Sequence, residues 1–242
     1  MCCFSLTKKA SKQSKTLQNL STINCTIASC VKMANSQQEV ELAFLEKSQS
    51  FQLKSCYFRS KVGGKPPWLS LKYLPGNERL TCSCCGRICV FLLQIYCPID
   101  GKQNCFHRSI YVFCCNNPRC YEKDVVGAVK IFRCQLPRKN PYYGYEPLDD
   151  SDFEISALPT AETYQQLCHV CGCVGAKRCG NCKLAYYCSK EHQVLDWKER
   201  HKMLCTATGD SFSGMPLIGA YYASVMVECC TIHSRSIVNI SY

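Results

Sequence analysis

Short runs of β-branched and aromatic residues dominate the chain from residue 40 to residue 136. They cover 40–45, 51–53, 88–96, 108–115 and 128–136. Their lengths and composition are typical of β-strands. Asp100-Gly101 lies between the third and fourth runs and favours an antiparallel hairpin. This pattern predicts an N-terminal β domain over residues 39–140.

Three flanking segments differ from this pattern. Residues 1–32 are rich in Ser, Thr and Lys and lack acidic residues, which predicts a disordered basic extension. Residues 141–167 hold 6 acidic and no basic side chains, as expected of an acidic linker between two domains. In the divergent tail, residues 206–242, the longest apolar run is too short and too interrupted to span a membrane.

Cysteine usage decides the class of protein. The chain has 24 Cys among 242 residues, which suits either disulfides or metal sites. The N-terminus has no continuous apolar segment of the kind that directs export, and C-x2-C spacings in such a chain favour zinc over disulfides. Three filled zinc sites would lower the formal charge of +11 to about +7.

Residues 168–205 contain four pairs of zinc donors. The pairs are Cys168/Cys171, Cys179/Cys182, Cys188/His192 and His201/Cys205. Eight donors fill two tetrahedral sites and leave no position for water, which predicts closed structural sites. The segment is too short for a sufficient apolar core, whereas each structural zinc contributes roughly 10–16 kcal/mol. Spacing alone allows sequential or interleaved pairing.

A helix is predicted inside this finger. Ser189 is a favourable N-cap, Glu191 suits the first turn, and the helix should run to about Met203. It would carry one histidine of each site. Leu195 and Trp197 are expected to pack against the zinc loops, with a peptide-binding surface as the alternative.

A third donor set lies in the β domain. Cys82 and Cys85 form a C-x2-C pair followed by Gly86, whose freedom to adopt positive φ lets backbone N–H groups face the sulfurs. The returning pair is Cys120 with Cys114 or Cys115. Two such corners joined by a hairpin resemble a zinc ribbon.

The other cysteines of this half are predicted to be small buried hydrophobes, namely Cys84, Cys89, Cys97, Cys105 and Cys134. His107 is expected to be a hydrogen-bonded strand residue and not a ligand. Trp68 follows Gly63-Gly64 and Pro66-Pro67 and is expected in the core.

Residues 168–205 resemble a MYND zinc finger. The runs AKRC, AYYCS and EHQVLDW in the finger, with 60–69, 91–96 and 135–140 in the β domain, are similar to the programmed cell death protein 2 family. The resemblance covers about 39–205. It implies interleaved sites, Cys168, Cys171, Cys188 and His192 for one ion and Cys179, Cys182, His201 and Cys205 for the other. His192 departs from the Cys that is usual there.

The resemblance also completes the predicted fold. It favours Cys115 with Cys120 in the third site, hence three Zn²⁺ ions per chain. The fold class is mainly β: an incomplete β-barrel-like N-terminal domain with a zinc ribbon, plus a small α+β MYND finger. Family members continue after the finger with a second β region that completes the barrel. The chain thus resembles a C-terminally truncated or alternatively spliced form.

No catalytic motif is found, so a non-enzymatic protein-interaction role is expected. The resemblance implies a dedicated chaperone of a small-subunit ribosomal protein in ribosome biogenesis. The alternative is a MYND-mediated corepressor adaptor in apoptosis and cell-proliferation control. Direct nucleic-acid binding rests only on residues 61–140, which hold 13 basic and 4 acidic side chains. We expect a monomer, cytoplasmic and nuclear, without membrane contact.

Overall fold

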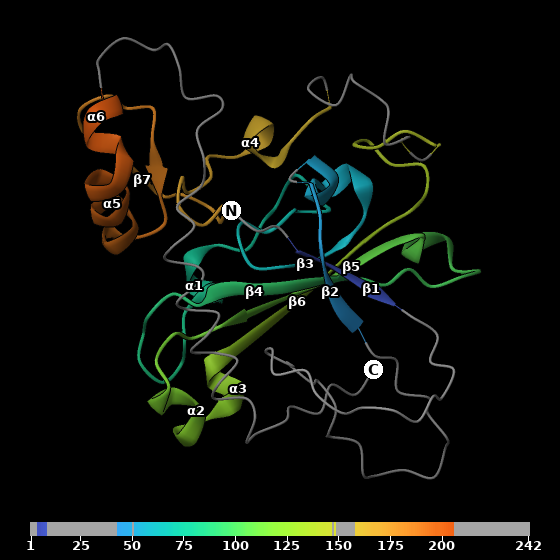
Figure 1. Cartoon of the computed structure of the whole chain (residues 1–242), viewed down its shortest axis with the longest axis horizontal. Coiled ribbons are helices and arrows are strands. Elements are labelled where there is room, and N and C mark those ends of the chain that lie inside the picture. The colour runs from blue at the N-terminus through green and yellow to red at the C-terminus, as the bar shows by residue number, and fades with distance from the viewer. Residues whose placement is uncertain (1–3, 9–42, 50, 147, 149–157, 206–242) are drawn as a thin grey trace.

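A six-stranded antiparallel sheet forms the body of the protein (Figure 1). The computed structural model describes residues 4–8, 43–49, 51–146, 148 and 158–205. The strand order is β2-β1-β3-β4-β5-β6. The strands are β1 Phe4–Lys8, β2 Ala43–Lys47, β3 Ser60–Val62, β4 Val90–Tyr96, β5 His107–Cys114 and β6 Val129–Leu136.

Strands β4, β5 and β6 form the centre of the sheet and one of its edges. The β4–β5 hairpin predicted from Asp100-Gly101 is confirmed, and Gly101 has a φ of +73° in the connection. A register shift between Phe91 and Leu93 marks a β-bulge, which increases the local twist. Strand β6 pairs with β5 along its whole length, from Val129 to Leu136.

Residues 51–53 were predicted to be a strand, and that prediction is wrong. Phe51–Leu53 is a 3₁₀ helix, followed by a second one at Ser55–Tyr57. The backbone N–H groups of Gln52 and Lys54 donate to the carbonyls of Gln49 and Phe51. A run of three residues is too short to specify a period, so local turns satisfy the backbone here in place of a ladder.

Two strands were not foreseen. Strand β1 lies within 1–32, where the sequence predicts disorder; residues 9–32 lie outside the described part of the chain. Its alternation of Phe4 and Leu6 with Ser5 and Thr7 is a short strand pattern within a Ser- and Lys-rich segment. Strand β3 precedes the two glycines and pairs with β4.

Short helices fill the connections of the β domain. They are α1 Asn77–Leu80, α2 Arg119–Lys123, α3 Val125–Ala128 and a 3₁₀ helix at Gln103–Cys105. Helix α1 leads into the first Cys pair, and α2 begins one residue before Cys120. These helices therefore hold the two corners of the predicted ribbon at one end of the sheet.

The finger consists of a two-stranded sheet and a helical segment (Figure 1). Its elements are β7 Lys177–Arg178, β8 Tyr186–Tyr187, α5 Lys190–Asp196, a π-helix at Trp197–His201 and α6 Lys202–Leu204. The continuous helix predicted from Ser189 to about Met203 is present, with its middle turn widened.

One continuous hydrophobic cluster joins the β domain to the finger. Trp68 is 5 % exposed and packs on Tyr111 and Phe113, with ring centroids 4.9 and 5.9 Å away. Tyr187 and Ala185 of the finger belong to the same cluster. The prediction that Trp68 is a core residue is confirmed, and the core extends into the finger.

Both described ends of the acidic segment 141–167 pack on this cluster. Tyr143 is buried and its hydroxyl donates to the carbonyl of Leu69 at 2.7 Å. Helix α4, Ala161–Tyr164, begins with a capping box at Thr160 and buries Ala161. Leu167 is also buried, directly before the finger begins.

The barrel is not closed by any pairing among the described strands, because β2 and β6 are the two ends of the strand order. The tail 206–242 lies outside the described residues. In the described part of the chain, no helix is both long and apolar enough to cross a membrane.

Candidate metal centres

Twelve cysteine and histidine side chains form three clusters of four. Within each cluster the ligand atoms all lie within 4.8 Å of one another. The clusters are Cys82, Cys85, Cys115 and Cys120; Cys168, Cys171, Cys188 and His192; and Cys179, Cys182, His201 and Cys205. They contain the twelve residues that the sequence and the resemblance single out, and the two finger clusters are interleaved.

All four side chains of the first finger cluster are buried. The Cys171 and Cys188 sulfurs are 3.5 Å apart, and the Nδ1 atom of His192 lies 3.0 Å from the Cys188 sulfur and 3.6 Å from the Cys168 sulfur. Imidazole thus occupies the position where a thiolate is usual in this type of finger. The His192 ring faces the sulfurs through Nδ1.

In the second finger cluster, two of the four side chains are partly exposed, Cys182 and Cys205. The sulfurs of Cys179 and Cys205 are 3.6 Å apart, and the Nε2 atom of His201 lies 3.5 Å from the Cys182 sulfur. The Asn181 side chain donates to the Cys205 sulfur at 3.3 Å. A hydrogen bond of this kind stabilises a thiolate.

The third cluster joins the two corners at the end of the β4–β5–β6 sheet. The Cys85 and Cys115 sulfurs are 3.5 Å apart, and the backbone N–H of Asn117 donates to the Cys115 sulfur. Cys114, the other candidate ligand, is buried at the end of β5 outside the cluster. The structure therefore groups Cys115, and not its neighbour, with Cys120.

These donor sets fit zinc. A tetrahedron with Zn–S bonds of about 2.3 Å has edges of about 3.8 Å, close to the separations of 3.5–3.6 Å between sulfurs. Each set supplies four protein donors, so water has no place in the first shell. Moreover, the structure shows the 18 described cysteines as free, without disulfides. A zinc ion in any of the three would hold chain segments together and would have no open position for a substrate.

Each C-x2-C pair closes with the same turn. The residue after the second Cys donates its N–H to the carbonyl of the first: Gly86 to Cys82, Gly172 to Cys168 and Lys183 to Cys179. Gly86 and Gly172 both have a φ of +70°, as the sequence predicts, and Lys183 has +57°. The third turn therefore holds a lysine in the left-handed region that favours glycine.

We expect opposite effects on stability at two of these turns. Gly86→Ala should lower the free energy of unfolding by about 1–2 kcal/mol through backbone strain alone, because nothing lies within 4 Å of the added Cβ. Lys183→Gly should relieve backbone strain and raise the free energy of unfolding by less than about 1 kcal/mol. Thermal unfolding of the zinc-loaded chain measures both stability changes. Changes of the same sign for the two variants would contradict this account of the turns.

The helical segment of the finger carries one histidine for each finger cluster. The Ser189 hydroxyl accepts the N–H of His192 at 3.3 Å and caps α5. Five residues later the helix widens into the π-helix that ends at His201. Such turns occur at functional positions and alter where the following side chain points.

A buried aspartate fixes this segment from within. Asp196 is fully buried, accepts the Tyr187 hydroxyl at 2.8 Å and accepts the Nε–H of Arg200 at 3.0 Å. The ring of His169 lies 3.9 Å away on the other side. This network ties the helical segment that carries His192 and His201 to β8. Sequence reasoning did not identify Asp196, because an acid on a short helix more often faces solvent.

The prediction that the remaining cysteines of the β domain are buried is confirmed for two of the five. Cys89 and Cys105 are buried, and burial raises the pKa of the Cys89 thiol to about 12. Cys84, Cys97 and Cys134 are only half-buried.

His107 lies outside the metal clusters. It is buried against Phe58, with ring centroids 4.0 Å apart, and its Nδ1 lies 3.0 Å from the Tyr96 hydroxyl. Burial lowers the pKa of His107. As the sequence predicts, it is a hydrogen-bonded residue and not a ligand.

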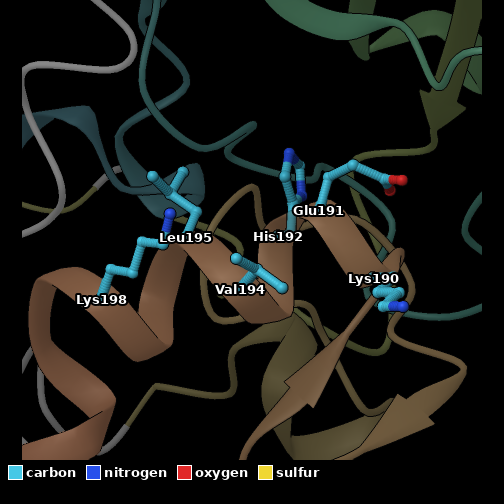
Figure 2. Close-up of a pocket in the computed structure, with 6 residues that line it drawn as sticks. All are labelled: Lys190, Glu191, His192, Val194, Leu195 and Lys198. Atoms are coloured by element: carbon cyan, nitrogen blue, oxygen red, sulfur yellow. The ribbon is translucent and has the colours of Figure 1, made fainter.

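A groove lies along α5 and the start of the π-helix (Figure 2). Its lining residues are Lys190, Glu191, His192, Val194, Leu195 and Lys198. Leu195, predicted to pack against the zinc loops, is half-buried and packs on the hydrophobic cluster. Trp197, expected to be packed as well, leaves 41 % of its surface exposed, although its ring lies 5.9 Å from that of His201.

Comparisons with known proteins match both halves of this architecture. Residues 39–150 match the family described as "Programmed cell death protein 2, N-terminal domain", and residues 168–205 match the MYND finger. No solved structure matches the chain.

Curated relatives cover both halves. The chain is 48 % identical over 170 residues to programmed cell death protein 2 of Rattus norvegicus and 46 % identical over 173 residues to that of Mus musculus. Each alignment covers 69 % of this chain and 48 % of the relative, so the chain spans about half the length of these relatives. Egl nine homolog 1 of Mus musculus is 45 % identical over 49 residues, which are 20 % of this chain and 12 % of that protein. With its β domain and its finger both matched, the chain belongs to the programmed cell death protein 2 family.

Proposed function

We propose that this chain is a non-enzymatic, zinc-stabilised chaperone that binds a newly made small-subunit ribosomal protein during ribosome biogenesis. The observation that carries the proposal is the closure of all three clusters by four protein donors each. In closed sites, zinc contributes to folding and has no position for a substrate. Three such ions would give a small chain a rigid surface for binding proteins. We further propose that it acts in the cytoplasm and the nucleus.

The edge of the sheet supports a client-binding role. Among the described strands, β6 pairs only with β5. Ile131 on this strand is 45 % exposed. An edge strand offers backbone donors and acceptors to an extended segment of another protein, and apolar side chains beside it supply affinity. An aggregation-prone client could be held at this edge until RNA replaces the chaperone.

Co-purification from cells with the tagged full chain tests this function. We expect one small-subunit ribosomal protein to be recovered in near-stoichiometric amount. Ile131→Lys should reduce its recovery severalfold, because a charged residue on an edge strand opposes strand addition. Val126→Lys is the matched control, since Val126 is 82 % exposed on α3 and forms no part of the strand. Recovery of no ribosomal protein would refute the chaperone.

The groove on α5 favours a second function, that of a corepressor adaptor. Figure 2 shows Val194 and Leu195 between the flanking lysines Lys190 and Lys198. An apolar strip of this kind suits a proline-rich peptide, which loses little entropy on binding. Under this alternative the same purification yields a corepressor complex, and Val194→Asp abolishes its recovery while Ile131→Lys does not.

A further inference from the structure

The two finger clusters differ in how they meet the rest of the chain. Three residues of the β domain, Lys65, Trp68 and Asn77, contact the backbone that carries the first finger cluster. The second cluster receives a hydrogen bond from within the finger, from Asn181 to Cys205. The first cluster is therefore embedded in the interface between the two parts, and the second faces outward.

Trp68 contacts the turn that closes the first Cys pair. Its indole N–H donates to the carbonyl of Gly172 at 2.8 Å, in a buried position. The N–H of the same Gly172 donates to the carbonyl of Cys168 at 2.9 Å. Two consecutive hydrogen bonds thus connect the indole to a ligand. Without the indole, the Gly172 carbonyl would be buried without this donor, which is unfavourable.

Lys65 packs against the same turn. A Cβ placed on Gly172 would lie 2.9 Å from the Cβ of Lys65, so the two backbones approach closely. Burial lowers the pKa of Lys65, whereas the carboxylate of Glu162 and the thiolates of Cys168 and Cys171 raise it. Three thiolates and one Zn²⁺ carry a net charge of −1, so a nearby lysine ammonium balances the first cluster.

Asn77 connects the same cluster to the third one. Its side-chain amide donates to the carbonyl of Cys188 at 2.5 Å. Asn77 is the first residue of α1, which leads into Cys82. The β domain thus holds the backbone of the first cluster at Cys188 and at Gly172, next to Cys171, while Cys182 and Cys205 of the second cluster are partly exposed.

We propose that Lys65, Trp68 and Asn77 are positioning residues that retain the zinc ion of the first finger cluster, leaving the second cluster as the exchangeable zinc site of the finger. The proposal rests on the zinc binding proposed above. Loss of an ion requires local opening of its loops, and opening the first cluster also breaks the interface with the β domain. The second cluster depends on the first through the loops that they share. The reverse dependence is weaker, because the β domain also holds the first cluster when the second one opens.

The test is timed alkylation of the full-length zinc-loaded chain in the presence of a chelator. N-ethylmaleimide modifies each thiol once its zinc has left, and peptide mass spectrometry locates the modified residues. We expect Cys179, Cys182 and Cys205 to be modified at least about tenfold faster than Cys168, Cys171 and Cys188. Native mass spectrometry first counts the ions, and a finger without two zinc ions would refute the proposed zinc binding itself.

Two variants separate the positioning role from general stability. Lys65→Met and Trp68→Phe should each speed modification of the first set about tenfold and leave the second set unchanged. Lys177→Met is the matched control, because Lys177 is exposed on β7 and its replacement by Met removes the same charge. Equal rates for the two sets in the unaltered chain, or equal acceleration of both sets in the variants, would overturn the proposal.

Discussion

Replacing Cys188 with Ala is expected to unfold the whole finger and not one site alone. Cys188 belongs to the first cluster, and it follows Cys179 and Cys182 of the second along the chain. Because the clusters are interleaved, the same loops close both. Each ion contributes roughly 10–16 kcal/mol of binding free energy, which exceeds what a segment of this size gains from its apolar contacts. Native mass spectrometry should show at least one finger zinc lost and the other bound weakly.

Cys173→Ala is the matched control for this change. Cys173 is 1 % exposed, lies two residues from Cys171, and belongs to none of the three clusters. The Cys173→Ala variant should keep both zinc ions of the finger and lose little stability. If Cys188→Ala loses one ion and the second cluster keeps its zinc affinity, the two clusters are energetically independent, contrary to the interleaved geometry.

Asp196→Ala is expected to lower the free energy of unfolding by about 3–5 kcal/mol, because it leaves the Arg200 guanidinium without its buried partner. The hydroxyl of Tyr187 also loses its acceptor. The helix that carries both histidine ligands would then be released from β8. Urea unfolding of the zinc-saturated chain measures the loss of stability. We also expect a lower zinc affinity at both finger clusters.

Glu199→Ala controls for the loss of a carboxylate from the same segment. Glu199 is exposed on the π-helix, and its removal should change stability by less than about 0.5 kcal/mol. Tyr187→Phe removes only one of the two hydrogen bonds and should cost about 1–3 kcal/mol. A cost for Asp196→Ala no larger than that for Glu199→Ala would show that the buried network does not hold the finger together.

The sequence predicts the donors of the clusters because the signal is local. Two donors separated by two or three residues can meet one ion within a single turn, so each pair is visible in the sequence. How the pairs combine is a property of the tertiary structure. Spacing left sequential and interleaved pairings open for the finger, and Cys114 and Cys115 open for the ribbon. Resemblance to a known family favoured one choice in each case.

The features that sequence reasoning missed depend on long-range contacts. Trp68 was expected in the core, but its hydrogen bond to Gly172 spans 104 residues and has no sequence signature. The burial of Asp196 depends on Tyr187 across the finger. Residues 51–53 have strand-like composition, yet local turns satisfy their backbone. Charged residues on short helices and short apolar runs are ambiguous until the packing around them is known.

Counting the zinc ions tests the central claim most directly. Native mass spectrometry of the full chain should show three Zn²⁺ ions. X-ray absorption should show that sulfur atoms at about 2.3 Å from zinc make up most of the average coordination shell, with a minor share of nitrogen atoms at about 2.0 Å. Cys82→Ser should remove one ion and leave the finger pair. Two ions in the unaltered chain, with a count that Cys82→Ser leaves unchanged, would contradict the third site. A mass deficit from disulfides in place of bound zinc would contradict all three.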